Sequence, residues 1–297
     1  MPRTGYTLFH LLFAALALTG ARPACAQNHP AAAASTPAES AHQHPIRLNH
    51  LKRLDERLSK TPEQLRAQCR FVSDISTAPP PGIVALSFDD GPEPGQTELI
   101  LAVLAKHKVP ATFFMIGEKL RRHPDLVAKV QAEPTLLIGN HSWAHPNFHD
   151  IDAQAQRDDI LKSEGAQPLQ PSQPGQPTAS TLFRYPYGNS SCESNALLHE
   201  RGYRIVGWHV DSCDWAFDKD GEVDAKEALS CGVLSQYRKD FVGHVLSALR
   251  ARKGGIVLMH EIHPNTLAQL DRLIEQIKAE GFRFVRVDDP ALQASMR

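Results

Sequence analysis

The sequence predicts an α/β fold in which about seven parallel strands form a sheet, most simply closed into a (β/α) barrel somewhat short of the usual eight strands, preceded by a small N-terminal helical appendage. Two observations support this prediction. From Ile83 onward, short aliphatic runs alternate with amphipathic stretches of helical spacing, which is the order of strand–helix units in a parallel sheet. Clusters of ionisable residues also follow several of these runs, and barrel enzymes gather functional groups where strands end.

The first expected strand, 83–88, is a continuous aliphatic run with Pro and Gly on both sides, which is typical of a buried strand. The other expected strands are Ala111–Ile116, Thr135–Gly139, Leu182–Arg184, Tyr203–Val210, Gly255–Met259 and Phe282–Val287. The expected helices between them are Glu98–His107, Asp125–Ala132, Ala153–Glu164, Ser194–Gly202, Tyr237–Lys253 and Thr266–Glu280.

Two segments interrupt this alternation. Gln167–Ser180 is rich in Pro and Gln, and we expect it to be a surface loop. Asp211–Ser235 is expected to be a long connection of the kind that often shapes a binding site.

The N-terminus has the pattern of a secretory signal peptide over residues 1–26. Arg3 precedes an apolar stretch, and Ala24-Cys25-Ala26 offers the small residues of a cleavage site. The apolar stretch is too short for a stable membrane span. We therefore expect export to the periplasm or the medium. Lipid attachment at Cys25 is an alternative, although Arg22-Pro23-Ala24 is a poor match for it.

Residues 27–80 are expected to be a linker and a short helical appendage. Ala, Ser, Pro and His dominate up to about residue 48, which is a linker composition. Leu51–Arg70 has helical spacing, with a helix start at Thr61-Pro62-Glu63. No chemistry is identified in this segment. Residues 81–290 are expected to form the catalytic domain.

Charge and cysteine content narrow the function further. The formal net charge of the 297 residues is −1, and it becomes about −3 without the two arginines of the signal peptide. Such a chain has no polyanion-binding character, so we expect no nucleic-acid partner. Four cysteines remain after processing, and an even number in an exported chain favours disulfides. Of the three possible pairings we prefer the one with Cys213–Cys231, which closes one long loop.

Asp89 and Asp90 follow the first expected strand. Two carboxylates at the end of a buried strand repel each other, so a cation or an arginine must neutralise them. The alternative is that they are turn residues that cap the next helix.

His141 and His145 follow the third expected strand and are four residues apart. On a helical turn both imidazoles would face the same side and could reach one metal. Together with one carboxylate they would make a three-ligand site with open positions. In a chain with 15 histidines, a chance pair is the alternative.

Further ionisable residues follow the later strands. Arg184 could neutralise whichever carboxylate does not bind the metal. Asp211 and Asp214 follow the fifth expected strand, and His260 follows the sixth. An imidazole that is bonded to a carboxylate has a raised pKa, which suits a general acid.

Five motifs occur in the same order as in the polysaccharide deacetylase family (NodB homology domain, carbohydrate esterase family 4), which this chain therefore resembles from about residue 83 to 288. They are Ser87-Phe-Asp-Asp-Gly-Pro92, His141-Ser-x-x-His145, Arg184-x-Pro-Tyr-Gly188, Asp211-x-x-Asp214-Trp215 and Leu258-x-His260. The resemblance implies a distorted barrel of about seven strands and a metal-dependent hydrolase. Its expected substrate is an acetylated cell-wall or extracellular polysaccharide, from which it removes N-acetyl groups of N-acetylglucosamine-type sugars.

The resemblance also implies roles for individual residues. Asp90, His141 and His145 would bind one divalent metal, most often zinc, with cobalt, nickel and manganese as alternatives. Asp89 would be the general base that takes a proton from the attacking water. Arg184 would hold Asp89 in place.

The remaining roles concern the leaving group and the acetyl group. His260, oriented by Asp214, would protonate the leaving amine. The backbone N–H of Tyr187 would stabilise the oxyanion, and Trp215 and Leu258 would line the acetyl pocket.

The sequence departs from the family pattern at Tyr185, where Pro is frequent, and at Glu261, where Asp is frequent. We expect Glu261 to be structural and His263-Pro264 to start a helix. Two other functions stay open: a deacetylase-like carbohydrate-binding protein without activity, and a same-fold amidohydrolase or esterase that acts on another acetylated substrate. The sequence leaves the oligomeric state open.

Overall fold

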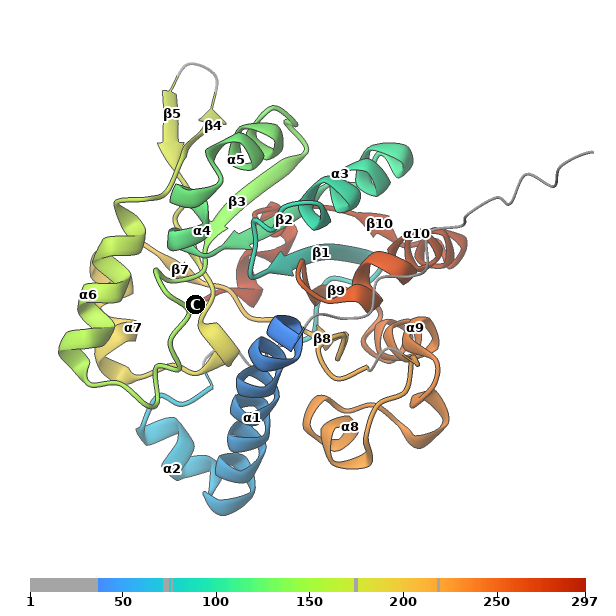
Figure 1. Cartoon of the computed structure of the whole chain (residues 1–297), viewed down its shortest axis with the longest axis horizontal. Helices are drawn as coiled ribbons and strands as arrows, with labels where there is room; N and C mark the ends of the chain where they lie inside the picture. Colours follow the sequence, from blue (N-terminus) through green and yellow to red (C-terminus); the bar gives the residue numbers. More distant parts are fainter. Residues whose placement is uncertain (1–36, 72–74, 76, 174–175, 218–219) are drawn as a thin grey trace, which may run out of the picture.

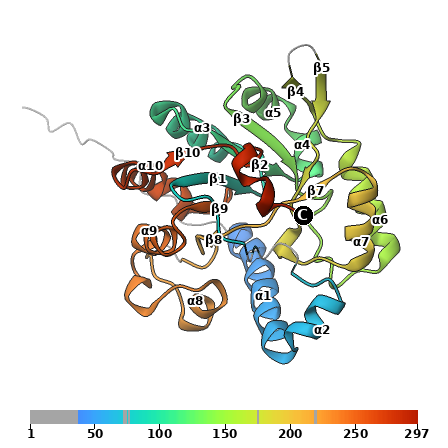
Figure 2. The same cartoon turned by 180° about the vertical axis from the view of Figure 1, so that it is seen from behind.

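The computed structural model describes residues 37–71, 75, 77–173, 176–217 and 220–297 (Figure 1). The expected signal peptide and the first part of the expected linker lie outside these residues. A curled parallel sheet lies at the centre of the described chain, and helices cover its outer side (Figures 1 and 2).

The sheet is the predicted distorted barrel, left open on one side. Its strand order is β7-β6-β3-β2-β1-β9-β8, and each strand is parallel to its neighbours in this order. A further short strand, β10, pairs with the beginning of β1. The strands are β1 (Ile83–Asp89), β2 (Ala111–Met115), β3 (Leu136–Asn140), β6 (Leu182–Phe183), β7 (Arg204–Ile205), β8 (Val210–Asp211), β9 (Gly255–His260) and β10 (Arg283–Phe284).

The central strands are buried on both faces, which explains their continuous aliphatic sequences. Every residue of β1, β2 and β9 is buried. Helices cover the outer side of this parallel sheet, so both faces of each central strand are shielded from water and both favour apolar side chains. The covering helices are α3 (Gln96–His107), α4 (Gly117–Arg122), α5 (Pro124–Gln131), α6 (Ala153–Glu164), α7 (Cys192–Glu200), α9 (Phe241–Arg252) and α10 (Pro264–Ala279).

The prediction of one continuous strand over 203–210 is wrong. The chain makes β7 and β8 instead, and these lie at opposite edges of the sheet. Between them, the carbonyl groups of Val206 and Gly207 accept hydrogen bonds from the guanidinium of Arg184 at 3.4 and 3.0 Å. The backbone of this segment is thus used to bind a buried cation, and it crosses the open side of the barrel rather than continuing a strand.

The expected surface loop at 167–180 contains a hairpin, so that prediction is also wrong. β4 (Leu169–Gln173) and β5 (Gln176–Ala179) pair antiparallel, apart from the main sheet. Proline is tolerated there because both strands of a two-stranded ribbon are edges. The connection 211–235 is long as expected, and it includes helix α8 (Ala225–Cys231) and the start of the short 3₁₀ helix η2 (Ser235–Tyr237).

The N-terminal segment is more helical than predicted. Helix α1 (Pro37–Ser59) begins inside the expected linker, where Ala and Glu favour a helix. Helix α2 (Pro62–Ala67) begins as predicted, with Thr61 as its N-cap and a reciprocal hydrogen bond to Gln64. Among the described residues, none of the helices combines the length and the hydrophobicity of a transmembrane segment.

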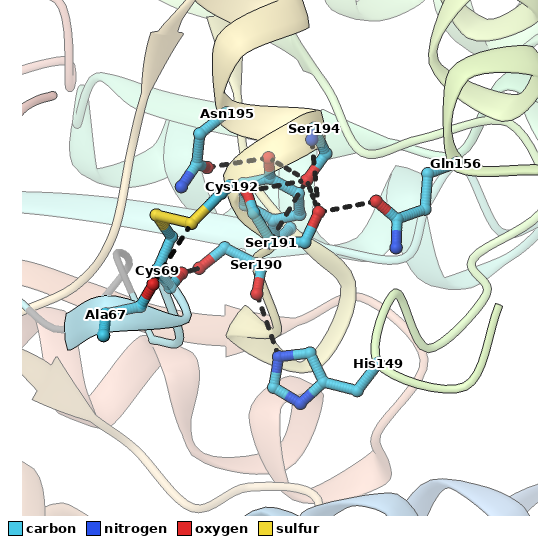
Figure 3. Close-up of a disulfide and its surroundings, with 10 residues drawn as sticks. Ala67, Cys69, His149, Gln156, Ser190, Ser191, Cys192, Ser194 and Asn195 are labelled. Atoms are coloured by element: carbon cyan, nitrogen blue, oxygen red, sulfur yellow. Dashed lines mark hydrogen bonds between the residues drawn. A yellow bond between two sulfur atoms is a disulfide. The ribbon is translucent and has the colours of Figure 1, made fainter. Parts of the chain in front are cut away.

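Two disulfides tie the long connections to the barrel. The preferred pairing is confirmed, because Cys213 bonds to Cys231 and Cys69 bonds to Cys192. The second bond joins the segment after α2 to the start of α7, where the Ser190 hydroxyl also donates to the Cys69 carbonyl at 2.7 Å (Figure 3). The appendage is therefore fastened to the barrel covalently.

The two disulfides differ in the loop that they close, and this predicts their relative contributions to stability. The Cys69–Cys192 bond spans 123 residues and the Cys213–Cys231 bond spans 18. Chain entropy then gives roughly 5 kcal/mol for the first and roughly 3 kcal/mol for the second. We expect the Cys69→Ala/Cys192→Ala variant to lose more free energy of unfolding in urea than Cys213→Ala/Cys231→Ala. Equal losses would contradict the entropic account.

Candidate metal centre and active site

Asp89 ends β1 and Asp90 follows it, and the backbone turns sharply between them. Successive side chains of a strand point to opposite faces. Asp90, however, has a φ of 73°, in the left-handed region that Asp tolerates better than most residues. Both carboxylates line the same pocket as a result. The turn continues into Gly91, where a Cβ would lie 1.7 Å from a carboxylate oxygen of Glu261.

Asp89 is neutralised by Arg184, as predicted. Nη1 of Arg184 donates to Oδ1 of Asp89 and to the Ser87 hydroxyl, each at 2.8 Å. Arg184 is fully buried, and its charge lies 4.1 Å from the centre of the Phe114 ring. Burial lowers the pKa of Arg184, and the charge of Asp89 opposes this shift. The pair holds the Asp89 carboxylate in one orientation.

Asp90, His141 and His145 come together at the mouth of the barrel. Oδ1 of Asp90 lies 3.3 Å from Nε2 of His141 and 3.0 Å from Nε2 of His145. The three candidate ligand atoms all lie within 4.8 Å of one another. A single cation can therefore contact all three.

The donor set fits a divalent cation. Nδ1 of His141 lies 2.8 Å from the carbonyl of Arg184, so a neutral ring donates there and turns its Nε2 lone pair toward Asp90. Oδ1 of Asp90 is buried and has no hydrogen-bond partner among the described residues. Lone pairs that face one another at such distances repel, and a cation between them removes the repulsion. Two imidazoles and a carboxylate are the ligands that zinc and similar metals bind.

A second group of possible ligands, His107, Asp271 and Glu275, lies between α3 and α10. Nζ of Lys106 already bonds both oxygens of Asp271, at 2.7 and 2.9 Å. This carboxylate has its counter-ion, and the group is a surface ion pair rather than a metal site.

The turn that carries the two histidines differs from the prediction. Residues 141–145 do not form a helical turn, because Ser142 and His145 have φ values of 67° and 57°. Side chains hold this conformation: Asn140 Oδ1 accepts from the Ser142 N–H at 2.9 Å, and the Ser142 hydroxyl accepts from the His145 N–H at 3.0 Å. Both carboxylate oxygens of Asp159 accept from the N–H groups between the two histidines. The imidazoles converge through these bonds rather than through helical spacing.

His260 and Asp214 form a second pair beside the metal ligands. Nδ1 of His260 lies 2.7 Å from Oδ1 of Asp214, and the His260 N–H donates to Oδ2 at 2.7 Å. The Thr266 hydroxyl also donates to Oδ2. Asp214 is thus fixed by three contacts, and it orients the imidazole at the end of β9.

Electrostatics make His260 a cation over a wide pH range. Burial alone would lower its pKa, but the charge of Asp214 and the hydrogen bond to it outweigh burial and raise the pKa to about 10. The pKa of Asp214 is about 2, because His260 outweighs the effect of burial on that carboxyl as well. The His263 ring meets the His260 ring edge-on, with 5.2 Å between the ring centroids. Helix α10 begins directly after His263, as expected.

The predicted substrate-contacting residues surround the same pocket. Tyr187 and Leu258 line it together with the metal ligands and His260. Tyr187 has a φ of 56° within the 3₁₀ turn η1 (Pro186–Gly188). Trp215 is buried next to the pocket, and its ring is stacked on that of His50 at 3.9 Å.

Glu261 occupies a structural position, in keeping with the expectation. It is fully buried under the turn that follows Asp90. The Thr97 hydroxyl donates to it and accepts from the Glu93 N–H at 2.8 Å. Burial raises the pKa of Glu261 to about 8.

The sequence analysis missed two residues that line the pocket, Trp208 and His50. His50 is the more informative of the two. It lies on α1, in a segment without an identified chemical role, yet it lines the pocket beside the three candidate metal ligands. One signal in the sequence was available. His50, Arg53 and Leu54 are spaced as one helix face, and all three are buried, so this helix turns a basic face inward.

The fold and the site together define a (β/α) barrel protein with a group of candidate metal ligands at the carboxyl ends of its strands, and known proteins are similar to it in sequence and in fold. Residues 76–206 match the family model for polysaccharide deacetylase. The chain is 34% identical over 206 residues to the peptidoglycan-N-acetylglucosamine deacetylase PgdA of Listeria monocytogenes, covering 69% of this chain but only 38% of that protein. It is 33% identical over 212 residues to a peptidoglycan-N-acetylglucosamine deacetylase of Bacillus cereus, covering 70% of this chain and 87% of the relative.

A solved structure agrees with these matches. The crystal structure of the Bc1960 peptidoglycan N-acetylglucosamine deacetylase superposes with a TM-score of 0.56 at 29% identity, covering 71% of this chain and 89% of that one. The chain belongs to the polysaccharide deacetylase family, carbohydrate esterase family 4.

The donor set predicts one metal site per chain. Calorimetric titration of the chelator-treated protein with Zn²⁺ should give one binding event that Asp90→Asn or His141→Ala weakens by at least about 100-fold, since even outer-shell changes at metal sites cost 10–100-fold. His107→Ala is the matched control, because it changes the surface group and not the centre. If His107→Ala abolished binding while His141→Ala left it intact, the site would be misassigned.

Proposed function

We propose that this chain is a metal-dependent hydrolase that removes N-acetyl groups from N-acetylglucosamine-type sugars of a cell-wall or extracellular polysaccharide. The observation that carries the proposal is one pocket lined by Asp89, Asp90, His141, His145 and His260. It combines three candidate metal ligands with a further carboxylate, that of Asp89, and a protonated imidazole, that of His260. A carbohydrate-binding protein without activity would not need this combination.

Asp90, His141 and His145 would hold the cation, most often zinc in sites of this ligand type, with cobalt, nickel and manganese as alternatives. The bound cation supplies Lewis-acid chemistry, which polarises a carbonyl oxygen and lowers the pKa of water. His141 is kept in the required tautomer by the Arg184 carbonyl.

Asp89 is the proposed general base. Its carboxylate lines the pocket and is paired with Arg184 at 2.8 Å. Oδ1 is engaged by the guanidinium at 2.8 Å, which leaves Oδ2 to accept a proton from the attacking water. Arg184 is a positioning residue, because it acts through Asp89.

His260 is the proposed general acid. Its Nδ1 is bonded to Asp214, so Nε2 is the nitrogen that can donate a proton to the leaving amine. Cleavage of the C–N bond leaves an amine that needs this proton, and the raised pKa of His260 keeps the proton available at neutral pH.

The acetyl group would be held by the rest of the pocket. Leu258 is buried and apolar, as the methyl group requires, and Trp215 is the other apolar group proposed for this wall. We propose the backbone N–H of Tyr187 as the oxyanion donor; one such donor contributes on the order of 3 kcal/mol.

Two further assignments complete the proposal. Residues 81–290 are the catalytic domain, and export through the signal-peptide pattern at 1–26 would bring it to its polysaccharide substrate. The relatives are named for peptidoglycan N-acetylglucosamine, which supports a cell-wall glycan as the substrate class.

Removal of the proposed base tests the assignment directly. Asp89→Asn keeps the size and one hydrogen bond to Arg184 but cannot accept a proton, so kcat should fall by about 10²–10⁴-fold. The measurement is acetate release from oligomers of N-acetylglucosamine in the presence of Zn²⁺ or Co²⁺, with loss of release on chelation.

The matched control is Asp125→Asn, an exposed carboxylate on α5, which should retain wild-type activity. Thermal unfolding of both variants separates loss of chemistry from loss of the fold. Full activity of Asp89→Asn would overturn the base assignment.

The pH dependence follows from the His260–Asp214 pair. A general acid is active while protonated, so activity falls as the pH rises through the pKa of His260. In Asp214→Asn the charge that raises this pKa is gone, and the pKa falls. We expect the alkaline limb of the kcat/KM profile to move to lower pH by more than about 1 unit relative to wild type with the same metal. An unmoved limb would assign that limb to another group.

A further inference from the structure

Helix α1 is not a peripheral appendage, because it contacts both sides of the barrel mouth. On one side, Arg47 donates to the carbonyl of Ala216 at 3.2 Å and lies 3.5 Å from a carboxylate oxygen of Glu227 on α8. Figure 1 shows α1 between α8 and the α6–α7 side of the barrel, and Figure 2 shows the same arrangement from behind. Ala216 belongs to the connection that follows β8.

On the other side, α1 contacts the loop that follows β3. Nζ of Lys52 lies 3.2 Å from Asp150, and Glu56 lies 2.8 Å from Nδ1 of His149. His149 is bonded in turn to the Ser190 carbonyl, next to the Cys69–Cys192 disulfide (Figure 3). The helix is thus fastened at both rims of the mouth, and the segment after it is fastened covalently.

Between these two anchors, α1 places His50 in the pocket. The His50 ring lies parallel to the Trp215 ring, with 3.9 Å between centroids and 4° between planes, and it meets the Tyr187 ring edge-on at 5.7 Å. Only 7% of His50 is exposed. The rings of Trp215, which is proposed for the acetyl pocket, and of Tyr187 therefore fix the orientation of an imidazole from the N-terminal helix.

We propose that α1, through His50, forms a wall of the substrate site and limits deacetylation to sugars at the end of a chain or in short oligosaccharides. The proposal rests on the deacetylase function proposed above. It assigns His50 as a substrate-binding residue that determines specificity.

A sugar inside a polymer is linked to a neighbour on each side. When such a sugar is bound, the polymer chain must therefore extend out of the pocket in two directions. A helix with its side chains is about 10–12 Å across. α1 crosses the mouth and is held at both rims, so it closes one of these directions. A terminal sugar needs only the other one.

His50 adds polar recognition to this wall. An imidazole offers both a donor and an acceptor, which suits the hydroxyl groups of a sugar. Stacking on Trp215 fixes the ring before the sugar arrives, so little rotational freedom is lost on binding.

The test is the position of deacetylation in the pentamer of N-acetylglucosamine, mapped by mass spectrometry with the full chain and Zn²⁺. Wild type should remove acetate from a terminal or near-terminal sugar at one end, and its rate per acetyl group on a long soluble chitin derivative should be at least about tenfold lower. An even distribution over all five sugars, with equal rates on the polymer, would overturn the inference and leave the deacetylase function standing. No acetate from either substrate would overturn both.

Two substitutions separate the wall from the hydrogen bond. His50→Phe keeps a ring against Trp215 but has no polar atom, so KM for the pentamer should rise about five- to tenfold with little change in kcat, and the terminal preference should remain. His50→Ala should raise KM similarly and also allow products at internal sugars. The control His199→Ala, an exposed histidine at the end of α7, should match wild type. Unchanged KM in both His50 variants would exclude contact between His50 and the sugar.

Discussion

The rest of the structure depends on how two adjacent carboxylates are neutralised at the end of a buried strand. Asp89 and Asp90 are both nearly inaccessible to solvent, and an unpaired charge in such a place costs several kcal/mol. The fold solves this with two different partners. Arg184 forms an ion pair with Asp89. His141 and His145 lie beside Asp90 and complete with it a set of three possible ligands for one cation. The two carboxylates thereby have different surroundings, which suits the roles proposed for them: Asp89 as the general base and Asp90 as a metal ligand.

Burying Arg184 has consequences for the barrel as a whole. A guanidinium has five N–H donors, and all of them need acceptors when water is absent. Asp89 and Ser87 accept from one side, and the carbonyls of Val206 and Gly207 accept from the other. The backbone that supplies these carbonyls cannot also continue a strand ladder at those groups. The open side of the barrel and the split of the expected strand over 203–210 therefore follow from the same buried cation.

Much of the fold and of the candidate site was predictable from the sequence, because each motif is local and strand ends meet at one edge of a parallel sheet. Charge alone predicted that Arg184 neutralises one of the two carboxylates, and the family resemblance implied that this carboxylate is Asp89. The predictions failed where long-range contacts decide the conformation. The conformation of 203–210 depends on Arg184. His141 and His145 converge as predicted, but through a non-helical turn that depends on Asp159, which lies on another element. The place of α1 was also not predictable, since helical spacing shows that a face is buried but not what covers it.

The inward face of α1 explains why this helix belongs to the site rather than to the surface. A helix that only packed on the barrel would turn leucines inward, whereas α1 buries His50 and Arg53 beside Leu54. Burying basic side chains is unfavourable unless aromatic faces or anions receive them. Here the Arg53 guanidinium lies over the rings of Phe71 and Trp208, and His50 is stacked on Trp215. Trp208 lines the pocket, and Trp215 stacks on His50, which also lines it. Contacts that stabilise the helix in this position therefore also place it beside the pocket.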